Sequence, residues 1–134
     1  MKFSSIPFYL LLGSAFAMAG SFESPAQGPF SRIESSVGRW SAQEGNARIE
    51  AGHAKSGKQS LRLAGEGERM VELELSSPSE KGAVLAFHAE RWTKRDPFQF
   101  RIDAKSAGAW QEIHHADGEV KVGGFLTEIR LTLP

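Results

Sequence analysis

A tryptophan in a densely charged stretch of the chain is the first candidate for ligand binding. Trp92 lies in the segment Glu-Arg-Trp-Thr-Lys-Arg-Asp at 90–96, between Arg91 and Arg95. Indole faces stack on the C–H groups of pyranose rings, and guanidinium groups bind carboxylates through paired hydrogen bonds. We therefore predict that Arg91, Trp92 and Arg95 form a glycan-binding surface, with the two arginines suited to an acidic sugar.

Two further side chains are predicted to extend this surface. Trp110 follows a Ser-Ala-Gly-Ala turn and is expected at the rim, whereas His88 is expected on the strand face opposite Leu85 and Phe87, lining a concave surface. Trp40 is assigned to the core. Because tryptophans in small sandwiches more often fill the core, the charges around Trp92 have an alternative interpretation, an interface that docks the domain onto a neighbouring catalytic domain.

The same sequence argues against catalysis. The chain has no cysteine, which removes thiolate nucleophiles and Cys-type zinc sites. Glu72 and Glu74 share one strand face, so they are predicted to form a solvated stripe rather than two acids facing across a cleft. Adjacent His114 and His115 point to opposite faces of a strand and cannot readily hold one metal ion. His53 is expected to bond the backbone. A small secreted hydrolase with an unrecognised site remains an alternative.

Charge excludes another class of partner. Sixteen basic residues balance sixteen acidic ones, giving a formal net charge of +0. A neutral domain has no field that would hold nucleic-acid phosphates, so no nucleic-acid partner is expected.

The elements that must position these side chains are predicted to be strands. Apolar and polar residues alternate at period two, which places apolar side chains on one face of an antiparallel sheet and charges on the other. Turn residues separate the runs, including Ser56–Lys58, Gly65–Gly67, Ser77–Gly82, Ser106–Gly108 and Asp117–Gly118. The alternation predicts an all-β antiparallel sandwich of eight to ten strands, with alternating runs at 47–51, 61–63, 71–75, 98–104 and 129–133.

The amino terminus is predicted to carry an export signal. Lys2 precedes a mostly apolar run at 6–17, and Ala17-Met18-Ala19 matches the small-x-small pattern before a cleavage site. Twelve residues rise about 18 Å as a helix, too short for a hydrocarbon core of about 30 Å. We predict a signal peptide at 1–19 cleaved near Ala19, one domain at 20–134, and a secreted or periplasmic protein with no membrane segment in its mature form.

The loop and strand at 53–63, together with segments 89–102, 110–113 and 120–125, resemble the N-terminal jelly-roll module of secreted bacterial sialidase-like (BNR-repeat) proteins. This module is galactose-binding-like and related to carbohydrate-binding modules, and Phe22-Glu23 fits its first strand. The resemblance implies a carbohydrate-binding accessory module associated with glycan degradation. The partners that it implies are a glycan or a neighbouring catalytic domain.

The resemblance also sets expectations for metal and catalysis. Such modules often hold a structural calcium near the first strand, which makes Glu23 and the carbonyls at 56–58 its candidate ligands. They also close with a further strand, but this chain stops at Pro134, so the sandwich is expected to close early or to lack that strand. Sialidase chemistry uses a tyrosine nucleophile, yet the only tyrosine, Tyr9, lies in the predicted signal peptide, and the Ser-x-Asp-x-Gly-x-x-Trp box is absent. A module without catalytic activity is therefore expected.

Overall fold

The computed structural model describes residues 8–12, 16–18, 22–63, 68–76, 82–95, 98–124 and 127–134. Every regular element in these residues is a strand, and the strands within each sheet pair antiparallel, which confirms the all-β prediction. The twelve strands are β1 (Phe8–Leu12), β2 (Phe16–Met18), β3 (Gly28–Phe30), β4 (Arg32–Ser35), β5 (Gly38–Ala42), β6 (Ala47–Ala51), β7 (Gln59–Leu63), β8 (Val71–Leu75), β9 (Val84–Ala89), β10 (Arg101–Ser106), β11 (Ala109–His115) and β12 (Thr127–Thr132).

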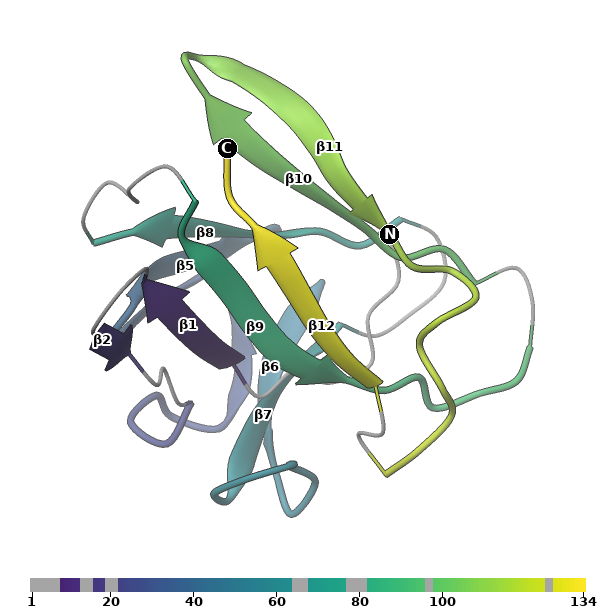
Figure 1. Cartoon of the computed structure of the whole chain (residues 1–134). Helices are drawn as coiled ribbons and strands as arrows, with labels where there is room; N and C mark the ends of the chain where they lie inside the picture. Colours follow the sequence, from purple (N-terminus) through teal and green to yellow (C-terminus); the bar gives the residue numbers. More distant parts are fainter. Residues whose placement is uncertain are drawn as a thin grey trace.

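The strands form four small sheets around one core. Their orders are β12-β9-β1-β2, β3-β6-β7, β4-β5-β8 and the hairpin β10-β11. In Figure 1, β9 and β12 form the near layer and β6 and β7 lie behind them. This layering is that of an antiparallel β-sandwich; the finer jelly-roll arrangement stays a prediction.

Period-two alternation explains how each layer contributes to the core. On β6 and β7, Ile49 and Leu61 are registered opposite each other and are buried, and Arg48 and Arg62 form the next pair on the outer face. On β9 and β12, Phe87 lies opposite Ile129, and both are buried. The core cluster also contains Phe22, Trp40, Leu63, Phe100 and Leu131.

Trp40 lies in this core as predicted, only 5% exposed. Its ring packs 5.2 Å from the ring of Phe22, and its indole N–H donates to the Ser35 hydroxyl at 3.0 Å. A buried indole needs such an acceptor because an unpaired buried N–H would be costly.

Two predicted strand assignments are wrong. Phe22 and Glu23 lie in a bend rather than a strand, and the strand predicted at 98–104 begins only at Arg101. Phe98 and Phe100 nevertheless face inward, because Phe100 belongs to the core and Phe98 packs against it. A bulge between Ile102 and Asp103 then interrupts the pairing of β10 with β11, which the alternation could not reveal.

The hairpin of β10 and β11 projects away from the two main layers (Figure 1). Its turn lies where expected, at Ala107 and Gly108, which both have positive φ values of 51° and 83°. Such a turn matches the twist of the flanking strands. The predicted cleavage site at Ala19, the predicted turn at 65–67 and most of the turn predicted at 77–82 lie outside the described residues.

Candidate functional site

The segment carrying Trp92 leaves the end of β9 and is fixed to a distant part of the chain. The backbone N–H of Arg91 donates to the Lys121 carbonyl at 3.0 Å, and the Arg91 carbonyl accepts from the Gly123 N–H at 3.1 Å. Arg91 and Val122 also form a parallel bridge. These bonds fix the base of the loop that presents Trp92.

Trp92 is 41% exposed and is held by two neighbours on other elements. The guanidinium of Arg62, on the outer face of β7, lies 3.5 Å from the centre of the indole. The His53 imidazole, from the loop after β6, packs in an edge-type contact with ring centres 5.1 Å apart. Cation–π and aromatic contacts of this kind restrict the indole to one orientation.

Each of these two neighbours is itself fixed by a carboxylate. Arg62 donates to both oxygens of Glu50 on β6, at 3.1 and 3.0 Å, and both side chains are about three-quarters buried. His53 Nε2 contacts Glu90 Oε1, and the Glu90 side chain is fully buried. We call Glu50, His53, Arg62, Glu90 and Trp92 the Trp92 cluster.

The structure gives His53 a partner that the sequence did not indicate. The residue was expected to bond the backbone, and its imidazole also meets the Glu90 carboxylate, 37 positions along the chain. Its backbone carbonyl accepts a hydrogen bond from the buried hydroxyl of Ser60. The His53 contact satisfies the buried carboxyl group of Glu90, and a buried polar group without a partner would be costly.

The two arginines predicted to bind a sugar carboxylate are placed differently from each other. Arg91 Nε donates to the Thr93 carbonyl at 2.7 Å and one of its terminal nitrogens donates to the Arg95 carbonyl at 3.4 Å. Its guanidinium also lies 4.5 Å from the ring centre of Phe98. Arg91 thus organises the loop, whereas Arg95 is exposed beside it.

Trp110 and His88 lie on other parts of the fold. Trp110 is 54% exposed next to the turn of the projecting hairpin, with the Lys105 ammonium 5.8 Å from its ring centre. His88 is half-buried on β9, opposite Glu128 of β12. The hairpin turn and the end of β9 lie well apart in Figure 1, so the structure places Trp110 apart from Trp92.

Glu23 contacts the loop that was predicted to share a calcium ion with it, but the contact is made by backbone N–H groups of that loop. Glu23 Oε1 accepts hydrogen bonds from the backbone N–H groups of Lys58 and Gln59 at 2.8 and 2.9 Å. These bonds lower the pKa of Glu23 below its ordinary value. Gln59 returns the contact by donating from its side chain to the carbonyls of Phe22 and Pro25. Together these bonds clamp residues 22–25 to the start of β7.

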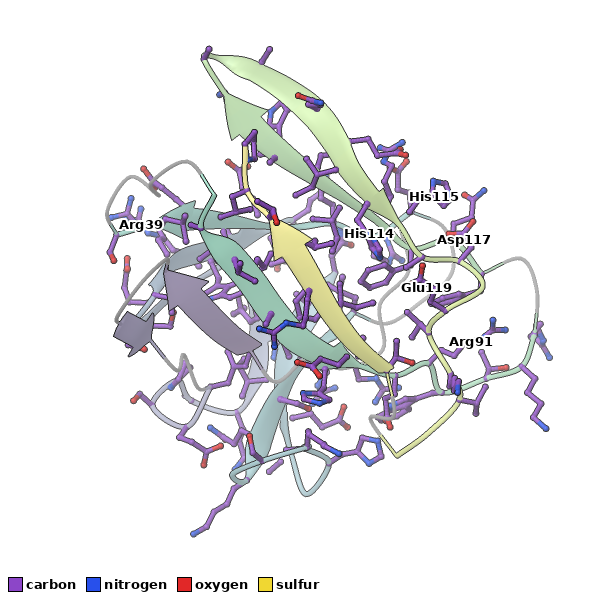
Figure 2. The ribbon with its side chains drawn as sticks, in the orientation of Figure 1. Arg39, Arg91, His114, His115, Asp117 and Glu119 are labelled. Carbon is purple, nitrogen blue, oxygen red and sulfur yellow. The ribbon has the colours of Figure 1, made fainter. Side chains whose placement is uncertain are left out.

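A second cluster of ionisable groups lies beyond the end of β11. Figure 2 shows His114, His115, Asp117 and Glu119 there, with Arg91 below them and Arg39 at the opposite, left-hand side of the view. The two histidines have different partners: Glu119 is 3.4 Å from His114, and Asp117 is 2.8 Å from His115 Nε2. This division matches the prediction that the two rings face different ways.

The partners of His115 shift its titration. Hydrogen bonds to Asp117 and Glu112 raise the pKa of His115. Asp117 is held mainly by the Phe100 N–H at 2.6 Å, and this bond, with the His115 contact, lowers the pKa of Asp117. Asp117 therefore links His115, at the end of β11, to Phe100 in the segment that enters β10.

The predicted acidic stripe is present on β8. Glu72 and Glu74 are exposed, and Glu74 accepts a hydrogen bond from Arg39 of β5 at 3.0 Å. Arg39 also donates to Glu34 of β4 at 2.9 Å, so Glu34, Arg39 and Glu74 form an ion-pair ladder across three strands.

In the part of the chain that the structure describes, no three His, Cys, Asp or Glu side chains are grouped so that they could hold a metal ion. Across the same described ranges, no helix is long and apolar enough to cross a membrane. Comparison of the chain with protein-family models, curated proteins and solved structures finds no match. The assignment of function therefore depends on the geometry of the Trp92 cluster.

Proposed function

We propose that the protein is an exported, non-catalytic carbohydrate-binding module, with Trp92 as its stacking surface. The observation that carries this proposal is an exposed indole that is already oriented by Arg62 and His53. A side chain held in its binding orientation loses little conformational entropy when a ligand binds, which favours affinity. Sugar rings match such a surface because their C–H faces stack on the indole and their hydroxyls bond nearby polar groups.

The contacts also say how a sugar would approach. The Arg62 guanidinium covers part of one indole face, so the ring would use the remaining exposed surface. Arg95, exposed beside this loop, is the arginine best placed to meet a carboxylate on an acidic sugar. Arg91 supports the site indirectly, by holding the loop through the Thr93 and Arg95 carbonyls.

The broader biological setting follows from the sequence. The predicted signal peptide supports a secreted or periplasmic location, and the resemblance to the sialidase-associated module supports a role beside an enzyme that degrades glycans. The same exposed tryptophan would also suit a surface that docks onto a catalytic domain, because indoles are common at the centres of protein interfaces. That alternative predicts no glycan affinity.

The test is a glycan array that contains neutral and acidic oligosaccharides, followed by calorimetry with each positive glycan. We expect Trp92→Ala to weaken binding at least tenfold, which corresponds to about 1.4 kcal/mol. Trp110→Ala is the matched control, since it removes the other exposed tryptophan, on the hairpin. Unchanged circular dichroism and melting temperature would show that both variants fold.

Three outcomes would reject the proposal. If no glycan binds, the docking alternative takes its place. Full binding by Trp92→Ala would remove the proposed surface, and loss of binding in Trp110→Ala alone would move the site to the hairpin. Turnover of a fluorogenic glycoside by the purified chain would contradict its non-catalytic character.

A further inference from the structure

The inner edge of β9 is the feature that points beyond glycan binding. In the full chain, β9 lies between β12 and β1. Its residues 84–87 are registered opposite residues 8–11 of β1 and also opposite β12 on the other side. Both β1 and β2 lie within the segment predicted to be cleaved after export. Removing that segment would expose the backbone edge of β9 that faces β1.

This edge has none of the features that usually keep a sheet edge from pairing. The sequence Val-Leu-Ala-Phe-His-Ala of β9 contains no lysine, arginine, acidic residue, proline or glycine. Natural edge strands are usually interrupted by charges, proline or bulges, because an open apolar edge pairs with other strands. The antiparallel register with β1 shows that this side of β9 can take a further strand.

We propose that the mature protein is a dimer in which β9 pairs antiparallel with β9 of a second copy. A second copy fits because a strand without lysine, arginine or acidic residues faces an identical strand, and because a two-fold interface uses one surface on both partners. A strand from an unrelated protein would need its own complementary pattern, whereas β9 supplies both halves.

Side-chain alternation restricts the register. Leu85 and Phe87 pack with the core, whereas alternation places Val84, Ala86 and His88 on the other face of the strand, where Ala86 is 3% exposed with β1 in place. A two-fold axis at Ala86 places Leu85 of one copy opposite Phe87 of the other, so the apolar face stays continuous across both sheets. A register shifted by one residue would place the core-side residues of one copy opposite residues from the other strand face of its partner.

The experiment expresses the 134-residue chain in a secreting bacterial host and uses the protein recovered after export. Intact mass gives the amino terminus, and light scattering during size-exclusion chromatography gives the oligomeric state over a range of concentrations. We expect cleavage near Ala19 and a dimer. Ala86→Lys places two lysines face to face at the axis and should raise the dimer dissociation constant at least tenfold.

Mixing variants of opposite charge tests whether Ala86 lies at the dimer axis. Ala86→Lys mixed with Ala86→Glu should restore the dimer, because opposite charges then meet at the axis. Thr132→Lys is the matched control, since Thr132 is exposed on β12, on the other side of β9 from the edge. It should leave the dimer intact.

The proposal is overturned if the exported protein keeps its leader or is a monomer throughout the concentration range. A dimer that survives both Ala86 variants would also overturn it, because its contact would then lie elsewhere. Should Ala86→Lys fail to fold, hydrogen exchange of the unaltered protein decides: β9 amides must become more protected as the protein concentration rises, and concentration-independent exchange contradicts the dimer. The glycan measurements are independent of these outcomes.

Discussion

Substitution of His53 tests whether the buried end of the Trp92 cluster is held as described. The Glu90 side chain is fully buried, and the His53 side chain that contacts it is 44% exposed. His53→Ala should lower the free energy of unfolding by about 1–3 kcal/mol, since the buried Glu90 carboxyl group loses a hydrogen-bonding partner. The loss is smaller than the roughly 3–5 kcal/mol typical of a broken buried pair, because water can enter from the exposed side.

The assay is urea denaturation of the wild type, His53→Ala, Glu90→Gln and the double variant. A thermodynamic cycle over these four proteins should give a coupling energy of about 0.5–3 kcal/mol, as found for residues in direct contact. Arg32→Ala is the control: Arg32 and Glu34 lie 3.8 Å apart with side chains 60% and 64% exposed, so its loss should cost less than about 0.5 kcal/mol. A coupling energy near zero, or a His53 effect no larger than the control, would refute the assigned contact.

Three further results are expected from the clamp around Glu23 and from the His115 pair. Gly57→Ala should lower the melting temperature more than Gly52→Ala: both glycines have positive φ, which costs alanine about 1–2 kcal/mol, but only at Gly57 would the new Cβ lie 2.5 Å from Glu23 Oε1. Glu23→Gln should lower the melting temperature even in EDTA, because a neutral amide oxygen accepts the two backbone N–H bonds more weakly than the carboxylate does, and neither bond involves a metal. By NMR titration, the pKa of His115 should lie above 6.5 and fall in Asp117→Asn.

Specific outcomes would contradict these expectations. Equal effects of the two glycine variants would mean that the Glu23 side chain can move aside and still keep its hydrogen bonds to the backbone N–H groups. A Glu23→Gln effect that appears only with calcium would instead support the structural calcium predicted from the sequence. Because the folded pKa of His115 is raised, its contribution to stability is complete below the unfolded value and disappears as the pH rises through the folded value. A His115 contribution to stability that appears only at alkaline pH would contradict this pH dependence.

The alternation of apolar and polar residues was enough to predict several strands, because it shows which side of the strand faces the core. The runs at 47–51 and 71–75 coincide with β6 and β8. It failed at 98–100, where the two phenylalanines face inward although the segment is not a strand. There the Asp117 carboxylate, rather than a neighbouring strand, accepts the Phe100 N–H, and a side-chain acceptor leaves no period-two signal.

The candidate site was predictable only in part. Charge density around Trp92 indicated an exposed indole, and the structure places it at the surface. Its partners Arg62 and His53 come from another layer, and Glu90 meets His53 from 37 positions away. Contacts of that sequence separation depend on how the sheets pack. A single sequence carries no direct signal for them.

The most direct test of the account follows the indole signals during a glycan titration. The chain has three tryptophans, so a ¹⁵N-labelled sample gives one indole signal each from Trp40, Trp92 and Trp110. With a glycan identified on the array, the account predicts a saturable shift of the Trp92 signal and none for the buried Trp40. A glycan that binds without shifting the Trp92 signal would contradict the account.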